Sequence, residues 1–521
     1  MEANIIIKNG KCLSMEGDET YEWIAIRDDL IEDVGNGDGF LHYISEDTKI
    51  IDAEGKTVLP GFIDNHFHVV ITGINQNSVD LINAKSLEEV GILIKDAMAN
   101  NPDKVLLTHN FQCEQINMDS FPGRAVWDKF CNSMPLVVFG KDYHTIMLNS
   151  CAMLFFKVPF ALDGVEVDEN YIPTGVFKKQ AGVILYMNIS DSFSDEYCDK
   201  AVSSVVKKLH KKGITTVAAM EGGSMGVSPH YNRDAEFIYK YKDKYHLGME
   251  LFYQSTNINK IKEMGLTRIG GALYVDGTIG CRTAAISFGY KDSEDNYGVY
   301  CINKDFLNKF TLDCYKNNLQ LALDAIGDNA VQWVIEAHEY AVEHAGLSPL
   351  RHRIEHCELI NEEQMERAAK LGLVLSMQPT YEGLWGGQGK MYEQRLGENY
   401  LKTNPYREII DHGLVLCGGS DSDVTEANPL LGIHCAINHP VPFHRINLDE
   451  ALRMFTINGA FALRLEDRLG SIKKGKQADI IILNGDIYNI KKSDIKDVEV
   501  ETTIKDGEVV FCKNQDRVIT C

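Results

Sequence analysis

Positive charge, paired cysteines and long apolar runs are all scarce in this sequence. Lysine and arginine number 52 against 75 aspartates and glutamates, which gives a formal net charge of −23. Nucleic acids and anionic membrane surfaces require a positive field on the protein, so neither is expected as a partner. A small molecule is the better expectation.

The 13 cysteines include no CxxC pair, and the first residues, MEANIIIKNGKCLSM, lack the basic and apolar regions of a secretion signal. No apolar run reaches the length needed to cross a membrane. We therefore expect a cytoplasmic protein with reduced thiols, most of them buried as small apolar side chains. Cys281 and Cys357 lie beside motifs described below, so a reactive role for them stays open.

At 521 residues the chain is too long for one compact core, and two domains are expected. Both ends alternate apolar and polar residues between turn signals, as short antiparallel strands do. The simplest arrangement combines residues 1–60 and 466–521 into one small β-sandwich domain, with a larger domain, residues 61–465, inserted between them.

The larger domain alternates apolar strand runs with amphipathic helical stretches such as SDEYCDKAVSSVVKKLHKK, KDFLNKFTLDCYKNN and NEEQMERAAKL. Eight strand runs can be placed: PGFIDNHFH, GITTVAAME, LGMELFYQ, GALYVDG, LQLALDAIG, HRIEHCE, LGLVLSMQ and GLVLCGGSD. This count predicts an α/β fold, a closed (β/α)₈ barrel of the TIM type, with its chemistry at the C-terminal ends of the strands. The gap before GITTV is too long for a loop, so residues 75–210 are expected to contain an inserted subdomain with strands of its own, for example MPLVVFGKDYH.

Two histidines in PGFIDNHFHVV are the strongest chemical signal. Residues two apart on a strand point to the same face, so His66 and His68 both enter the barrel mouth while Phe67 points outward. One strand can thus supply two nitrogen ligands to one metal ion. The alternative is a pair of hydrogen-bonded core histidines.

The last strand, GLVLCGGSDSDV, ends in a carboxylate. Asp421 is expected to face the two histidines, where it can ligate metal and accept a proton from water; the alternative is a helix cap, a role that suits Asp423 better. His356 ends its own strand at the mouth as a second-metal ligand, a donor to a substrate oxygen, or a structural residue. Glu355 and His352 are weaker candidates for a role at the site, because a shift of one residue turns Glu355 to the other face.

A set of motifs in fixed order extends along nearly the whole chain: PGFIDNHFH, GKDYHTIMLNS, PTGVF, GITTV, YVDGTIGCRTAA, DAIGDNAV, HRIEHCELI, SMQPT, NPYREIIDHG, GGSDSDV and GSIKKGKQADIIIL. In this set the sequence resembles the amidohydrolase superfamily. More narrowly, it resembles the large-insert branch of amidohydrolase family 3, which includes YtcJ-like proteins and N-substituted formamide deformylases and is related to D-aminoacylases. The resemblance implies the barrel fold and says little about the substrate.

Two positions depart from what the resemblance implies. Typical members carry, in the strand before the DG turn, a lysine modified to a carbamate that bridges two metals; the matching residue here is Ala272. Typical members have H-A-I-G-D in the fifth strand, where this chain has Asp324 in place of the histidine ligand. The ligand set implied is therefore His66, His68, Asp324 and Asp421 around one divalent metal, Zn²⁺ first and Fe²⁺ or Mn²⁺ as alternatives. Whether Asp324 reaches the metal or only hydrogen-bonds a water or substrate stays open.

Other candidate contacts follow from the same resemblance. His144 matches a histidine of the inserted subdomain, and Arg282 follows the fourth strand, where it can hold a carboxylate by paired hydrogen bonds; each is equally compatible with a structural role. Lys178 and Lys179 follow PTGVF, where relatives usually offer a glutamate at the second position, so a changed pocket charge is expected. Glu221, at the end of GITTVAAME, is a candidate carboxylate near the position of the lost bridge; the alternative is a surface-facing or loop glutamate.

The predicted function is hydrolysis of a C–N bond in an amide, N-formyl or cyclic amide compound, with a metal-activated water, Asp421 as proton acceptor and His356 stabilising the oxyanion. Two alternatives stay open: metal-dependent isomerisation or decarboxylation, and a degenerate barrel that binds a small molecule without turnover. A homodimer is the default expectation for an oligomer.

Overall fold

The computed structural model describes residues 2–100, 104–113, 116–141, 145–158, 160–222, 233–513 and 518–520. The chain divides into two compact units. The barrel unit comprises Met1–His68, Val206–Glu221 and Ile238–Cys521, and the insertion unit comprises Val69–Val205 and Gly222–Phe237.

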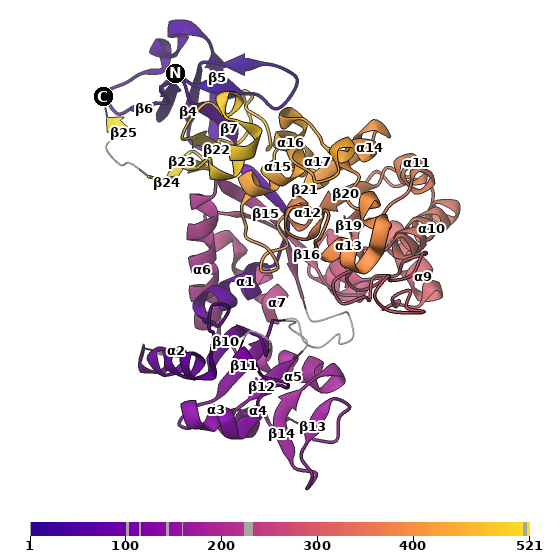
Figure 1. Ribbon diagram of the computed structural model, residues 1–521. Coiled ribbons are helices and arrows are strands. Elements are labelled where there is room, and N and C mark those ends of the chain that lie inside the picture. Colours follow the sequence, from indigo (N-terminus) through magenta and orange to yellow (C-terminus); the bar gives the residue numbers. More distant parts are fainter. Residues whose placement is uncertain are drawn as a thin grey trace. The chain divides into compact units, whose positions relative to one another are not determined.

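The barrel unit is built on one parallel sheet of eight strands, whose order in the sheet follows their order in the chain (Figure 1). The strands are β8 (Phe62–Phe67), β15 (Ile214–Glu221), β16 (Gly248–Tyr253), β17 (Arg268–Tyr274), β18 (Gln320–Ala325), β19 (Arg353–His356), β20 (Val374–Met377) and β21 (Val415–Gly418). A bridge between Phe67 and Ser422, and a hydrogen bond of 2.8 Å from the Asp421 N–H to the His66 carbonyl, connect the first strand to the segment after the last. All eight predicted strand runs are confirmed.

Helices follow most of these strands, and those predicted from SDEYCDK, KDFLNKF and NEEQMERAA are confirmed as α6, α9 and α11. Side-chain caps begin two of them: Asn303 accepts from the amides of Asp305 and Phe306 at α9, and Asn361 forms a capping box with Gln364 at α11. The helices are α6 (Asp195–Lys211), α7 (Arg233–Tyr241), α8 (Ile258–Glu263), α9 (Lys304–Lys316), α10 (Asp328–Ala345), α11 (Glu362–Lys370), α12 (Pro379–Trp385), α13 (Met391–Leu396), α14 (Tyr406–Asp411), α15 (Pro429–Ile437), α16 (Leu448–Met454) and α17 (Ile457–Ala462). The 3₁₀ helices are η1 (Gly37–Tyr43), η4 (Lys242–Lys244), η5 (Gly397–Lys402), η6 (Pro442–His444), η7 (Ile487–Asn489) and η8 (Lys492–Asp497).

Strand β17 is irregular in its middle. Gly270 and Gly271 have φ of +95° and +90°, and the pairing register with β18 shifts between Gly270 and Tyr274. A side chain at position 270 would place its Cβ 2.0 Å from the carbonyl oxygen of Ala322, so only glycine fits there. This bulge immediately precedes Ala272, the position at which the implied lysine is absent.

Strands from both ends of the chain combine beside the barrel, and Figure 1 shows the indigo and yellow segments together. One sheet has the order β25-β6-β1-β4-β5 and the other β24-β23-β22-β7-β2-β3. Their shared core consists of residues such as Ile7, Ile24, Ile480 and Ile504. The strands are β1 (Ile5–Lys8), β2 (Lys11–Leu13), β3 (Thr20–Tyr21), β4 (Trp23–Arg27), β5 (Leu30–Gly35), β6 (Lys49–Asp52), β7 (Thr57–Pro60), β22 (Ile480–Leu483), β23 (Val500–Lys505), β24 (Glu508–Cys512) and β25 (Val518–Thr520).

The insertion unit has a six-stranded sheet of order β13-β14-β12-β11-β10-β9, with a core around Trp127. The sequence places this insertion at residues 75–210, whereas the compact unit begins at Val69 and also takes in Gly222–Phe237, after the second barrel strand. Its elements are α1 (Val69–Asn77), β9 (Val79–Asp80), α2 (Leu87–Asn100), β10 (Leu106–Phe111), α3 (Arg124–Phe130), β11 (Leu136–Gly140), β12 (Ile146–Leu148), α4 (Ser150–Phe156), β13 (Val165–Val167), β14 (Pro173–Phe177) and α5 (Lys179–Asp191).

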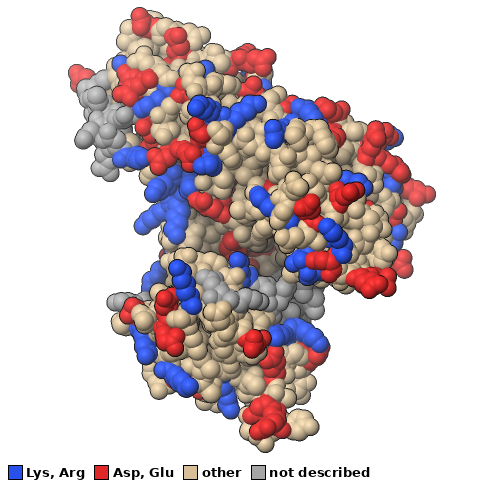
Figure 2. Space-filling view, in the orientation of Figure 1, with Lys and Arg blue, Asp and Glu red and all other residues tan. Residues whose placement is uncertain are grey.

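Acidic and basic side chains are interspersed over the face drawn in Figure 2, so the negative charge is not gathered into one patch there. Among the described helices, none combines the length and the apolar character that a membrane crossing requires.

Candidate metal centre

Two histidines of β8 and one carboxylate after β21 meet at the barrel mouth. The Nε2 atoms of His66 and His68 lie 3.4 Å and 3.2 Å from Oδ1 of Asp421. The ligand atoms of these three residues all lie within 4.8 Å of one another, and His66 and Asp421 are buried. The structure thus brings together three of the four metal ligands that the sequence predicts.

In each histidine the ring nitrogen that points away from Asp421, Nδ1, contacts a hydrogen-bond acceptor. Nδ1 of His68 lies 2.7 Å from the carbonyl oxygen of Met220, which can only accept, so this nitrogen carries the proton. Nδ1 of His66 lies 2.9 Å from Oε2 of Glu355. Both rings therefore present Nε2 toward Asp421, and Nε2 of His66 is buried without a hydrogen-bond partner in the described chain. Rings fixed in this way by a carbonyl and a carboxylate are typical of metal-binding histidines, so the donor set fits a divalent metal ion.

Charge at this point favours cations. Burial alone would lower the pKa of His68, but Asp421 and Glu221 raise it to about 9. Burial alone would raise the pKa of Asp421, but His66, His68 and His356 outweigh it and hold the pKa well below its usual range. A metal ion and protons thus compete for the same atoms in this cluster.

Asp421 and His356 both have left-handed backbone conformations, with φ of +51° and +66°. Such a conformation costs on the order of 1 kcal/mol or more for a residue other than glycine and is concentrated at functional sites. His356 is the last residue of β19 and Asp421 lies in the segment that follows β21, so both conformations occur where barrel strands end.

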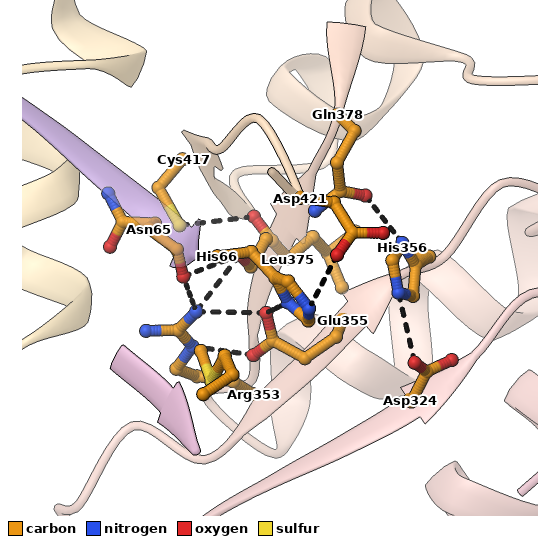
Figure 3. A network of polar contacts seen from close by, with 12 residues as sticks. Asn65, His66, Asp324, Arg353, Glu355, His356, Leu375, Gln378, Cys417 and Asp421 are labelled. Atoms are coloured by element: carbon orange, nitrogen blue, oxygen red, sulfur yellow. Dashed lines mark hydrogen bonds and ion pairs between the residues drawn. The ribbon is translucent and has the colours of Figure 1, made fainter. Parts of the chain in front are cut away.

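His356 contacts the chain through both ring nitrogens (Figure 3). Nε2 lies 3.0 Å from Oδ2 of Asp324, and Nδ1 lies 2.7 Å from Oε1 of Gln378. Burial alone would lower the pKa of His356, but Asp324 raises it to about 10, so the ring is a cation at neutral pH. Asp324 does not belong to the converging group of His66, His68 and Asp421. Its other oxygen, Oδ1, is buried and has no partner among the described residues.

Ala272 is buried, and its carbonyl oxygen accepts a hydrogen bond from Nε2 of Gln254. Glu221 ends β15 and is buried, close enough to raise the pKa of His68. It is thus part of the electrostatic surroundings of the metal centre.

Three residues at the site were missed from the sequence. Tyr381, in α12 directly after β20, donates its hydroxyl to Oδ2 of Asp421. Gln378 directly follows β20, and because its Oε1 accepts from His356, its buried Nε2 is left without a partner in the described chain. Both belong to SMQPTYE, a strand end followed by proline, which was a usable signal. The third is Glu355, which was predicted to turn to the outer face; it is buried and contacts Nδ1 of His66.

The remaining predicted site residues form ion pairs with other side chains of the protein. Arg282 donates from Nε and Nη2 to Asp292, at 2.9 Å and 2.8 Å, and Arg395 shares that carboxylate. In the insertion unit Lys178 pairs with Glu166 at 2.6 Å and Lys179 with Asp163 at 3.5 Å.

His144 lies outside the described residues. Cys281 is exposed, and burial raises the pKa of the Cys357 thiol well above its usual value, which disfavours a thiolate there. Glu362, Glu366 and His412 form another converging donor group, on an exposed surface.

Comparison with known proteins agrees with the motifs. The family model described as "Amidohydrolase family" matches residues 49–511. The chain is 26% identical to "Putative amidohydrolase YtcJ" of Bacillus subtilis (strain 168), over 96% of this chain and 97% of the relative. It is 25% identical to "N-substituted formamide deformylase" of Arthrobacter pascens, over 88% of this chain and 89% of the relative. The crystal structure of an uncharacterized metal-dependent hydrolase from Pyrococcus horikoshii OT3 superposes with a TM-score of 0.79 at 21% identity, over 94% of this chain and 99% of that one. With the family model matched over most of its length, the chain belongs to the amidohydrolase family.

Proposed function

We propose that this protein hydrolyses a C–N bond of a small molecule, in an amide, N-formyl or cyclic amide group, with one divalent metal ion held by His66, His68 and Asp421. The observation that carries the proposal is the convergence of these three donors within 4.8 Å, with the far nitrogen of each histidine held by an acceptor. The relative named as an N-substituted formamide deformylase supports the class of bond.

Zn²⁺ is the metal we favour, with Fe²⁺ or Mn²⁺ as alternatives. Three protein ligands with nitrogen and oxygen donors leave a position for water or substrate, as catalytic zinc sites do. We assign one metal per chain because position 272 carries no lysine and Asp324 is engaged by His356. Of the two roles that the sequence left open for Asp324, we therefore favour the hydrogen-bonding one.

When bound, the metal supplies Lewis acidity, which polarises the substrate carbonyl and makes water more acidic. Asp421 accepts the proton that the attacking water loses, while Tyr381 fixes its carboxylate by donating to Oδ2. The proton then passes from Asp421 to the leaving nitrogen as the C–N bond breaks, so the products are a carboxylic acid and an amine.

We assign oxyanion stabilisation to His356 and Gln378 acting together. His356 donates one ring N–H to Asp324 and the other to Gln378. It therefore contributes to oxyanion stabilisation through its positive charge and not through a hydrogen bond. Because Oε1 of Gln378 accepts from His356, its unpartnered Nε2 is available to donate to a substrate oxygen.

The proposal is tested on protein purified without chelator. Elemental analysis is expected to find about one metal per chain, and His412→Asn, which removes one donor of the exposed group at α11 and α14, is expected to leave that number unchanged. A screen of N-acyl, N-formyl and cyclic amide compounds in H₂¹⁸O is expected to yield a carboxylate that carries the label. Absence of metal under replete conditions, or turnover without label in the product, contradicts the proposal; the latter favours isomerisation or decarboxylation.

A further inference from the structure

A buried pair of opposite charges lies directly behind His66 (Figure 3). Arg353 and Glu355 stand two apart on β19, so both side chains enter the barrel interior, and both are 0% exposed. Nε of Arg353 lies 2.7 Å from Oε1 of Glu355, and Nη2 lies 2.9 Å from Oε2, which is a two-point ion pair. Oε2 of Glu355 is the atom that also meets Nδ1 of His66, at 2.9 Å.

Arg353 holds the neighbouring backbone as well. Its Nη2 donates to the carbonyl oxygen of Asn65, at 2.5 Å, and to Oγ of Ser376, at 2.9 Å. Asn65 directly precedes His66 in β8. The same guanidinium therefore fixes the backbone beside the histidine and, through Glu355, the orientation of the ring.

Burying the ion pair of Arg353 and Glu355 lowers stability unless further hydrogen bonds, such as those to Asn65, Ser376 and His66, compensate for the lost hydration. Transfer of two charges into a protein interior carries a desolvation penalty that their attraction often fails to offset. Both oxygens of the buried Glu355 side chain are engaged: Oε1 accepts from Nε of Arg353, and Oε2 lies 2.9 Å from Nη2 of Arg353 and 2.9 Å from Nδ1 of His66. An apolar pair would fill the same space, but it would leave Nδ1 of His66 without an acceptor.

We propose that Arg353 and Glu355 are positioning residues for the metal centre: they hold His66 with the proton on Nδ1, so that Nε2 faces the metal as a lone pair. Glu355 cannot itself reach the metal, because it contacts the nitrogen on the opposite side of the ring from Asp421. The two histidines are thereby unequal, since His68 has a neutral carbonyl behind it and His66 a carboxylate. A carboxylate acceptor makes the imidazole a stronger ligand. This inference rests on the proposed metal site.

The test is the affinity of the protein for Co²⁺, measured by competition with a chelator and by the visible spectrum of the bound ion. Glu355→Gln keeps the size of the side chain and removes its charge, and we expect Co²⁺ binding to weaken by about 10- to 100-fold, the range typical of such partners. The band positions should shift as well, because the ligand field of His66 changes. Neither readout depends on turnover.

The matched control is Asp479→Asn, which removes another buried carboxylate from an ion pair, with Lys505 at 3.2 Å, in the strands from the chain ends. It should lower stability and leave Co²⁺ affinity at the wild-type value. If the unpaired Arg353 prevents Glu355→Gln from folding, the double variant Arg353→Met/Glu355→Gln removes both charges and should show the same loss of affinity.

The outcomes separate the two proposals. If the wild type binds no Co²⁺ at His66, His68 and Asp421, the proposed function fails. If the wild type binds Co²⁺ and a folded Glu355 variant binds it within about twofold of wild type with an unchanged spectrum, the positioning role is overturned while the metal site stands.

Discussion

The two halves of the barrel mouth differ in what their polar side chains contact. On one half, at β8 and after β21, His66, His68 and Asp421 turn to a common point. On the other half, at β18 and β19, Asp324 and His356 bind each other, and Ala272 of β17 offers no donor side chain. The first half presents three donor side chains to one point, as a cation requires. In the second half the two polar side chains form an ion pair with each other. The difference supports our proposal of a single metal ion, with the positive charge of His356 beside it.

The largest expected effect is that of Asp421→Asn, on the first half of the mouth. It removes the proton acceptor and one metal ligand while keeping the shape of the side chain, so we expect turnover to fall by on the order of 10³-fold or more, as for loss of a general base. The measurement is kcat on the best substrate from the amide screen, alongside metal content. Activity within tenfold of wild type would show that this half is not where the chemistry takes place.

On the second half we expect Asp324→Asn to leave the metal content at about one per chain while kcat falls by roughly 10- to 100-fold, because the positive charge of His356 is no longer supported. Asp324 raises the pKa of His356 to about 10, so without it activity should decline at a lower pH than in the wild type. Loss of the metal in this variant would instead identify Asp324 as a ligand and remove the distinction between the halves.

Histidines away from the mouth provide a contrast in stability. His338 of α10 is fully buried against Tyr315 and His352, and burial lowers its pKa to about 3, whereas the unfolded chain has the ordinary value of 6.5. Below pH 6.5 His338 becomes protonated in the unfolded state but stays neutral in the folded state. The free energy of unfolding therefore falls as the pH drops from 6.5 toward 3. This one group should cost on the order of 2 kcal/mol by pH 5.

Urea unfolding at pH 7 and pH 5 measures this loss. His338→Gln should lose less stability than the wild type between the two pH values, by about that amount. Equal losses in the two proteins would mean that His338 is not kept neutral by its surroundings.

The smallest expected effect is that of Arg282→Gln. Its guanidinium donates two hydrogen bonds to Asp292 in an exposed ion pair. Such pairs contribute about 0–1 kcal/mol to stability. We expect kcat/KM to stay within about twofold of wild type for amide substrates with and without a carboxylate group. A selective loss for the carboxylate-bearing compounds would restore the substrate-binding role that the sequence left open.

The sequence was sufficient for the strands and for the first half of the mouth, because both depend on local patterns. Alternating or continuous apolar runs located all eight barrel strands, and the spacing of His66 and His68 fixed a shared face. The position of Asp421 followed from its place after the last strand of a closed barrel.

The second half could not be predicted because its contacts join different strands. Nothing local shows that Asp324 turns to His356, or that the His356 ring orients Gln378. Glu355 was placed on the wrong face because the strand was aligned on His356, the last residue of β19, whose left-handed backbone breaks the two-residue period. The cytoplasmic location and the homodimer remain predictions.

Anomalous diffraction at the absorption edge of the bound metal, from crystals of metal-replete protein, tests the central claim most directly. We predict one peak per chain, at about 2.0–2.2 Å from Nε2 of His66, Nε2 of His68 and a carboxylate oxygen of Asp421. No peak at that point, or a second peak bound by His356, would contradict the account.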